Sequence, residues 1–190
     1  MKASLTVSLL CFCIGIVTAQ SGAVIKGGLI VSDFERDGKS ILAQSATGYM
    51  AGFDIRLFAE ERTYLRPQVY LARMNLASQL HGSETGFFNA NKTGYDVIKG
   101  AMGLETRIIE VGNFDWHMAF SGTVDYVVNV RGDMKFEDVN VFGLGAQIST
   151  GFDIGILVLD FAFQHGFAGV LSADENSRAV VLHFSAGLAF

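Results

Sequence analysis

Apolar and polar residues alternate with a period of two along most of the chain, which is typical of β-strands whose two faces meet different surroundings. The clearest stretch is 114–128, where large apolar side chains occupy the even positions and smaller or polar ones the odd positions. The alternation predicts strands with one uniformly apolar face. The even set of this stretch is Phe114, Trp116, Met118, Phe120, Val124, Tyr126 and Val128.

Charged residues fall on the opposite face of the predicted strands. The longest apolar run, 154–171, contains Asp160, Gln164 and His165, which would be costly inside a membrane helix, and its period of two indicates a strand instead. His117 and His183 share the inward face and are expected to be hydrogen-bonded interior residues, not metal ligands. The charged side chains predicted to form a paired network in the interior are Asp54, Arg56, Arg66, Glu105, Arg107, Asp125 and Asp160.

Eight segments carry the strand pattern, and the connections between them alternate between tight turns and longer polar loops. Short turns on one side and long loops on the other are typical of membrane barrels. An even number of antiparallel strands puts both chain ends on the short-turn side. The predicted fold is therefore all-β, an eight-stranded antiparallel up-and-down transmembrane β-barrel. Its predicted strands are 22–34, 49–59, 63–74, 95–110, 114–130, 139–149, 152–165 and 179–190, with tight turns near 60, 113 and 151 and longer loops at 35–48, 75–94, 131–138 and 166–178.

Composition supports a lipid-facing surface. The chain of 190 residues is 50% hydrophobic and 17% charged, and its mean hydropathy is +0.35, a balance too apolar for most soluble domains of this size. The formal net charge is −5 and no run of Lys or Arg exists, which argues against nucleic acid as a partner.

The first 19 residues have the three regions of a secretory signal peptide, with a positive charge at Lys2, an apolar stretch and small residues before Gln20. Cleavage after Ala19 is expected, which leaves 20–190 as one barrel domain. Cys11 and Cys13 both lie in the removed segment. The mature chain would then lack a thiol, which excludes disulfides, zinc–thiolate sites and cysteine nucleophiles.

The segment 179–190 alternates up to a terminal phenylalanine and resembles the signal by which outer-membrane barrels are recognised for insertion. Phe184, Leu188 and Phe190 are its predicted assembly residues, with the barrel-assembly machinery as the implied partner. Three further stretches resemble the PorT-like family of small Gram-negative outer-membrane barrels: "VIKGGLIVSDF", "GYMAGFDIRLFAEERTYLRPQVYLARM" and "LVLDFAFQHGFAGVLSADENSRAVVLHFSAGLAF". The resemblance implies the architecture and says little about a biochemical role.

Two local features qualify the barrel. Pro67 lies inside a predicted strand and has no N–H to donate, which predicts a bulge or a place near the periplasmic rim. Aromatic residues near strand ends are predicted to form girdles at the two membrane surfaces: Tyr49, Phe58, Phe114, Trp116, Tyr126, Phe152 and Phe190.

An eight-stranded barrel is just wide enough for side chains to fill, so an open pore is not expected. The alternative is a narrow proton or ion path along the charged groups, or a binding pocket at the outer mouth. An enzymatic site on the outer rim is a further alternative, but loop polarity alone explains the residues that could form it. Those residues are His81, Ser83, Glu84, Asp174 and Glu175.

These observations predict a non-enzymatic integral outer-membrane protein, with both termini periplasmic and without a cofactor, a metal or catalytic residues. It would act as a structural element, an envelope tether or a binding protein that uses its surface loops, with membrane lipid and a protein at the long loops as partners. The competing hypothesis is a secreted or periplasmic lipocalin-like barrel that binds a ligand. The two differ in polarity, because a soluble barrel would turn its aromatic face inward and its charged face outward.

Overall fold

The chain forms nine strands and one short 3-10 helix in a computed structural model, which describes residues 22–36, 39–40, 46–75, 94–132, 135–171 and 174–190. Among these residues, no helix is long and apolar enough to cross a membrane. In chain order the elements are β1 (Gly22–Arg36), β2 (Lys39–Ser40), β3 (Ala46–Arg56), β4 (Thr63–Asn75), β5 (Gly94–Val111), β6 (Phe114–Arg131), η2 (Phe136–Asp138), β7 (Phe142–Ile154), β8 (Leu157–Leu171) and β9 (Asp174–Ala189).

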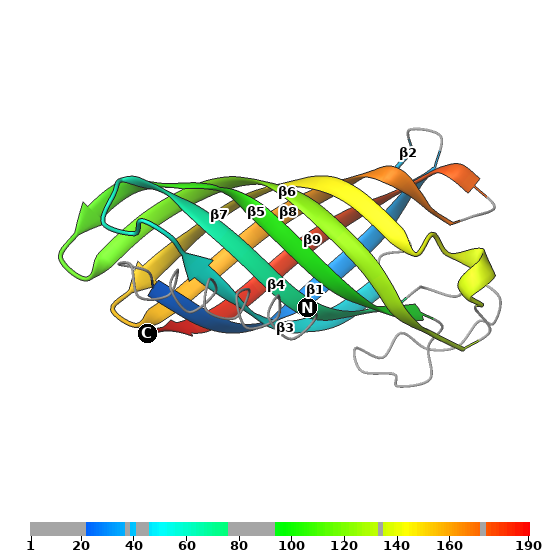
Figure 1. Cartoon of the computed structure of the whole chain (residues 1–190), viewed down its shortest axis with the longest axis horizontal. Helices are drawn as coiled ribbons and strands as arrows, with labels where there is room; N and C mark the ends of the chain where they lie inside the picture. The colour runs from blue at the N-terminus through cyan, green and yellow to red at the C-terminus, as the bar shows by residue number, and fades with distance from the viewer. Residues whose placement is uncertain (1–21, 37–38, 41–45, 76–93, 133–134, 172–173) are drawn as a thin grey trace, which may run out of the picture.

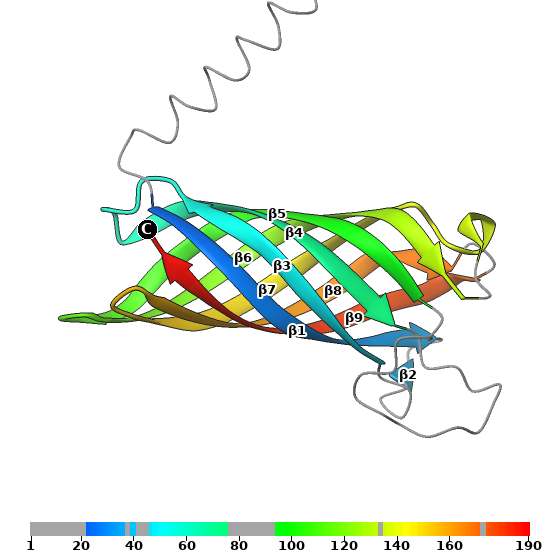
Figure 2. The same ribbon diagram turned by 90° about the horizontal axis from the view of Figure 1, so that it is seen from below.

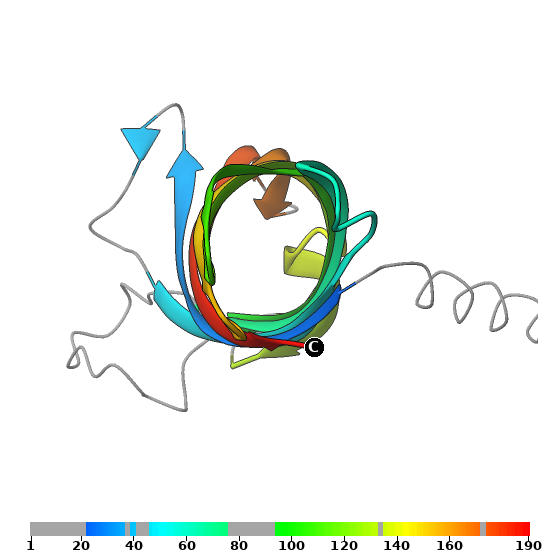
Figure 3. The same ribbon diagram turned by 90° about the vertical axis from the view of Figure 1, so that its left-hand side faces the viewer.

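The strands close into a barrel. Apart from β2, a two-residue extension paired with the end of β1, every strand is antiparallel to the next along the chain. The first and last strands also pair, from Val24 opposite Ala189 to Glu35 opposite Arg178, and Figure 3 shows the resulting ring. The predicted fold class, an eight-stranded antiparallel barrel, is confirmed.

The two ends of the barrel differ. At one end, here called the turn end, β5 joins β6 through Gly112 and β7 joins β8 through Gly155, and both glycines have positive φ angles, of 60° and 61°. Such angles favour glycine in tight turns. The start of β1 and the end of β9 lie at this end, on the left in Figure 1, whereas β2 and η2 lie at the opposite, loop end. Figure 2 shows the same two ends from below.

Two predicted connections are wrong. The turn expected near 151 lies instead at 155–156, because β7 continues to Ile154 and Gly151 is a packed strand residue. The long loop expected at 166–178 is mostly strand, since β8 extends to Leu171, which lies opposite Asp174 at the start of β9.

The barrel is apolar outside and polar inside. Phe120 and Leu71 on the outer face are 62% and 59% exposed, whereas Asp54 and Glu105 inside are 0% exposed. Phe184 and Leu182 point outward while His183 between them is buried. A soluble lipocalin-like barrel requires the opposite arrangement.

The interior has two layers. The half toward the loop end holds an apolar cluster that includes Ile30, Met74, Tyr95 and Val97. Val139, which follows η2, is 2% exposed and joins this cluster, and the nearby backbone is fixed by a 2.8 Å hydrogen bond from Val127 N–H to the Val141 carbonyl. The segment after η2 thus folds into the barrel mouth. The half toward the turn end is ionic.

Pro67 interrupts one ladder without a bulge. The pairs between β3 and β4 end at Asp54 opposite Gln68, and the same register returns only as an isolated bridge between Leu57 and Leu65. On the other side of β4, the ladder with β5 runs through Pro67 opposite Met102 without a shift. The missing N–H of proline therefore costs pairing on one side only, close to the turn end.

Candidate functional site: the ionic layer of the interior

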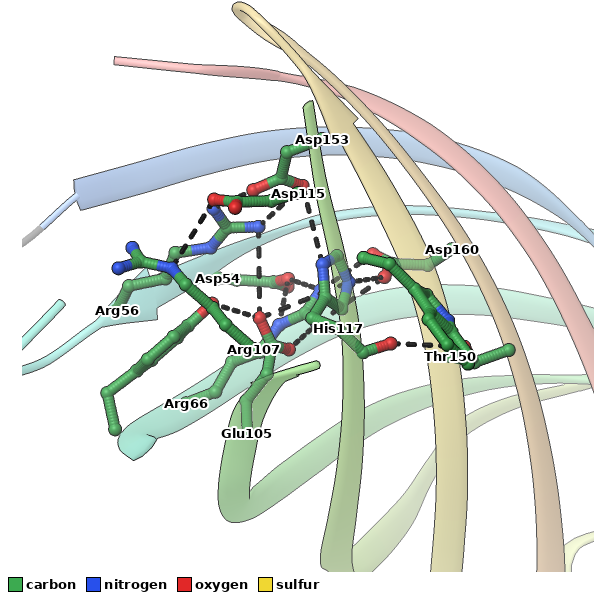
Figure 4. A network of polar contacts seen from close by, with 12 residues as sticks. Asp54, Arg56, Arg66, Glu105, Arg107, Asp115, His117, Thr150, Asp153 and Asp160 are labelled. Atoms are coloured by element: carbon green, nitrogen blue, oxygen red, sulfur yellow. Dashed lines mark hydrogen bonds and ion pairs between the residues drawn. The ribbon is translucent and has the colours of Figure 1, made fainter. Parts of the chain in front are cut away.

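Seven strands contribute to one buried group of charged side chains, here called the lumen network. Figure 4 labels its members apart from Lys26. Each member is on the inward face of its strand, and each is buried. The lumen network consists of Lys26 on β1, Asp54 and Arg56 on β3, Arg66 on β4, Glu105 on β5, His117 on β6, Asp153 on β7 and Asp160 on β8.

Arg66 is the centre of the lumen network, with a side chain only 1% exposed. Its Nε donates to Asp54 Oδ2 at 2.8 Å, and its Nη2 donates to Asp160 Oδ2 at 2.6 Å. Its Nη1 donates to Glu105. A guanidinium group carries five N–H donors in a fixed plane, which allows one Arg66 side chain to hold three carboxylates from three strands.

The remaining members surround this centre. Lys26 forms ion pairs with both Asp54 and Asp160, and Arg56 binds Asp153 through both terminal nitrogens, with Nη2 at 3.1 Å from Oδ1. His117 Nε2 lies 2.9 Å from Asp160 Oδ1.

Two tyrosine hydroxyls complete the carboxylate contacts. Tyr70 donates to Asp54 Oδ1 at 2.5 Å, and Tyr64 donates to Glu105. Buried charges are costly unless they are paired and hydrogen-bonded, and the carboxylates of the lumen network meet both conditions.

The charges of the lumen network nearly balance. Its four carboxylates face the basic side chains of Lys26, Arg56 and Arg66, each counted as +1. His117 is the fourth potential cation and contacts Asp160 on one side and Asp153, at 3.6 Å, on the other. The sum is therefore −1 with a neutral imidazole and zero with a protonated one. The group can thus form without leaving a large net charge buried.

A glycine makes room for these contacts. A Cβ atom at Gly151 would lie 2.5 Å from His117 Nε2 and would also collide with Asp160 Oδ1 and the Leu159 carbonyl. Gly151 therefore allows β7 to pass close to the lumen network, which explains a glycine in the middle of a strand.

Five of the seven predicted charged residues meet in the lumen network, and two lie elsewhere. Asp125 lies closer to the loop end of the barrel. Its Oδ2 is 2.7 Å from Lys99 Nζ and accepts a hydrogen bond from Gln164 at 3.1 Å. Arg107 is at the turn-end rim, with Nε at 3.4 Å from Asp115 Oδ2.

Sequence reasoning missed three partners that the same alternation could have found. Lys26, Lys99 and Asp153 all lie on the buried face of their strands. Lys26 has the parity of Ser32 and alternates with the apolar Ile25 and Leu29, so the pattern of the first strand already pointed it inward. Asp153 was missed because the sequence pattern predicted a turn near 151, where β7 in fact continues to Ile154.

The interior next to the lumen network is almost filled. A cavity of about 10 Å³ is lined by Arg66, Gln68, Ser149 and His183, among others, which is room for about one water molecule. Ser149 Oγ and His183 Nε2 have no hydrogen-bond partner among the described residues, so a water molecule there would satisfy them. A second cavity of about 30 Å³ lies in the apolar layer beside Met74.

His117 and His183 both lie in the interior of the barrel. In the described part of the chain, no group of three or more His, Cys, Asp or Glu side chains is placed to hold a metal ion. His117 serves the lumen network, and His183 lies at the small cavity. The chemistry that this site offers is charge pairing, because the space beside it is too small for a ligand larger than water.

The predicted assembly residues lie together on the outer face of β9 and just after it. Phe184 makes an edge-to-face contact with Phe161 at 4.9 Å between ring centroids, and Leu188 is exposed. Phe190 is 75% exposed, while its backbone pairs with Ala23 through hydrogen bonds of 2.8 and 3.3 Å. The Phe190 side chain thus contributes little to packing.

The structure describes only two of the five residues that could form an enzymatic rim site. His81, Ser83 and Glu84 lie outside the described residues, as does the predicted signal peptide. Asp174 and Glu175 are the first two residues of β9.

No protein-family model and no curated protein sequence matches the chain. Solved structures do match. The neisserial surface protein NspA aligns with a TM-score of 0.54 and 12% identity, over 88% of this chain and 97% of that one. Ail, the attachment invasion locus protein of Yersinia pestis, aligns with a TM-score of 0.44 and 12% identity over 90% and 99%. The outer membrane protein OprG from Pseudomonas aeruginosa aligns with 0.45 and 11% over 90% and 96%. The chain is therefore a small closed β-barrel with the fold of NspA.

Proposed function

We propose that this protein is an integral outer-membrane barrel with a sealed interior, whose role is to hold surface loops for a partner rather than to conduct solutes. The observation that carries the proposal is the inverted polarity of the barrel. Apolar side chains such as Phe120 and Leu71 cover the outside, and the ionised groups of the lumen network are enclosed. Such a surface is stable against acyl chains and unfavourable in water.

The height of the apolar surface fits a bilayer. Along β6, the stretch from Trp116 to Tyr126 is about 33 Å long at about 3.3 Å per residue, or about 25 Å along the axis at a tilt of about 40°. Membrane barrels carry an apolar band of about that height, flanked by aromatic residues. Phe114 and Phe152 stack at the turn end with ring centroids 5.8 Å apart, while Tyr49 and Tyr126 lie toward the loop end, so both edges of the band carry aromatic rings.

Two successive barriers support a non-conducting interior. An ion that entered from the loop end would first meet the apolar cluster around Val139 and then the lumen network. Passage would require both the desolvation of the ion and the separation of paired charges.

The predicted signal peptide and the final strand support a location and an orientation. A signal peptide at 1–19 would export the chain, and the segment ending in Phe190 would direct it to the assembly machinery of the outer membrane. Both ends of the barrel domain would then face the periplasm, and the loop end would face outward. The PorT-like family is the subfamily we favour for it.

The first experiment is fractionation of cells that express the full chain. The protein should appear in the outer-membrane fraction and migrate faster on a gel before boiling than after it. Recovery in the soluble periplasmic extract without detergent would contradict the proposal and favour the lipocalin-like alternative.

The second experiment is conductance in planar bilayers. The refolded protein should give no channels under conditions in which a general porin does. Regular single-channel steps would show that the interior is open and would support the alternative of an ion path along the lumen network. Cross-linking in intact cells, followed by identification of captured proteins, would then test whether the loops bind a partner.

A further inference from the structure

One group of charged side chains lies on the outside of the barrel, where apolar residues otherwise dominate. Tyr49, Arg73, Asp96 and Asn129 are direct ladder neighbours, one each on β3, β4, β5 and β6. With Arg131 they form what is here called the outer arginine cluster. We propose that this cluster binds the phosphate of a membrane lipid headgroup, an inference that rests on the proposed outer-membrane location.

Arg73 anchors the outer arginine cluster. Its Nε and Nη2 donate to the two oxygens of Asp96 at 2.8 and 3.1 Å, and Asn129 donates to Asp96 Oδ2 at 3.2 Å. The guanidinium carbon lies 5.5 Å from the centre of the Tyr49 ring. The Arg73 side chain nevertheless remains 40% exposed, so it is held in place and still accessible.

Arg131 supplies a second guanidinium group from the neighbouring row. Its Nη2 donates to the Met74 carbonyl at 3.2 Å and to Asn75 Oδ1 at 3.1 Å, and its Nε lies 3.4 Å from Asp96 Oδ1. The side chain crosses Gly94, where a Cβ atom would come within 3.0 Å of Nη2. A glycine at this position lets Arg131 reach across β5 toward Arg73.

The charge of the outer arginine cluster favours an anion. Two guanidinium groups share the single carboxylate of Asp96, which leaves one unit of positive charge at an exposed position. Arginine binds phosphate in a planar, two-point geometry that lysine cannot reproduce.

The position of the cluster selects a lipid phosphate over a dissolved one. The next outward row toward the middle of the barrel is Ala51, Leu71, Ile98 and Tyr126, again direct ladder neighbours, and all four are exposed. A lipid whose chains cover this apolar row would therefore place its headgroup beside Arg73. Charged residues at such a boundary commonly recognise anionic headgroups.

The test compares two lipids with identical chains, phosphatidic acid and phosphatidylcholine, bound to the folded full chain and measured by native mass spectrometry. The parent protein should bind phosphatidic acid at least tenfold more tightly, which corresponds to about 1.4 kcal/mol. The variant R73Q/R131Q should lose this preference. The matched control R178Q/K135Q removes the same charge from exposed residues near the same end and should keep it.

Each variant is first checked for the heat-modifiable gel shift. Should R73Q/R131Q fail to fold, R73K/R131K keeps the charge and removes the planar geometry, and the preference should then fall at least threefold. An unchanged preference in either arginine variant overturns the inference, and so does full displacement of the lipid by inorganic phosphate alone. A folded, membrane-inserted parent without any preference refutes this inference only, whereas a parent that stays soluble without detergent refutes the proposed function.

Discussion

Arg66 and Asp160 are 94 residues apart in the chain and meet inside the barrel, where Arg66 Nη2 donates to Asp160 Oδ2 at 2.6 Å. The contact joins β4 to β8, which are not neighbours in the sheet. Because Arg66 also holds Asp54 and Glu105, one side chain connects four strands through the interior in addition to their backbone ladders.

Replacement of Arg66 by methionine should destabilise the barrel severely. The change would leave Asp54, Glu105 and Asp160 buried with fewer partners, and the loss of one member of a buried ion pair typically costs about 3–5 kcal/mol. Urea unfolding in detergent micelles, followed by the fluorescence of Trp116, the single tryptophan, would measure the change. Arg62→Met removes the same charge at the exposed turn end and should lower the free energy of unfolding by less than about 1 kcal/mol. Equal effects of the two variants would contradict the central role of Arg66.

Two glycines in adjacent strands should respond differently to alanine. Gly151→Ala would push a methyl group against His117 and Asp160 and should cost about 1–3 kcal/mol of unfolding free energy. A methyl group at Gly122 would meet no atom of the described residues within 4 Å, so Gly122→Ala should be neutral or stabilise by up to about 1 kcal/mol. The comparison uses the same urea titration. A neutral Gly151→Ala would mean that the lumen network tolerates displacement.

A charge on the outer face should be costly at mid-height and tolerated at the rim. Phe120 is on the apolar face of β6, and Phe120→Arg should destabilise the protein in lipid vesicles by about 2–4 kcal/mol. Ile156 is equally exposed, at the turn between β7 and β8, and Ile156→Arg should cost about 0–1 kcal/mol. Equal and small effects at both positions would indicate that water rather than lipid surrounds the barrel.

Phe190→Ala should separate assembly from stability. The Phe190 side chain is exposed while its backbone pairs with Ala23, so the unfolding free energy should change by less than about 0.5 kcal/mol. If the residue is read by the assembly machinery, the amount of folded protein in the outer membrane should fall several-fold in cells. Refolding into pure lipid vesicles should stay unchanged. A parallel loss in both assays would assign Phe190 a structural role instead.

The alternation of residues was sufficient to predict the strands and their two faces. It assigned Phe120 and Leu182 to the outside and Asp54 and Glu105 to the inside, because a strand turns its side chains with a period of two regardless of what surrounds it. The number of strands and the closed ring followed from the same count.

Height along the axis could not be read in this way. Arg107 and Asp125, like Glu105, are at predicted inward positions of their strands. Arg107 nevertheless lies at the turn-end rim, and Asp125 lies between the lumen network and the loop end. Which residues share a level depends on the stagger between strands, which sequence alternation does not encode. The turn near 151 failed for a related reason, because Gly151 looks like a turn residue until the strands that press against it are known.

The composition of the lumen network has a consequence for how the barrel comes apart. Its members come from seven strands, and the pair of Lys26 and Asp160 spans 134 residues, so no hairpin contains the whole set of paired charges. A barrel opened at any seam would expose unmatched ions to the hydrocarbon. Partly opened forms are therefore penalised, and we expect the protein to unfold as a single cooperative unit and to fold slowly, because several of these contacts join residues that are distant along the chain.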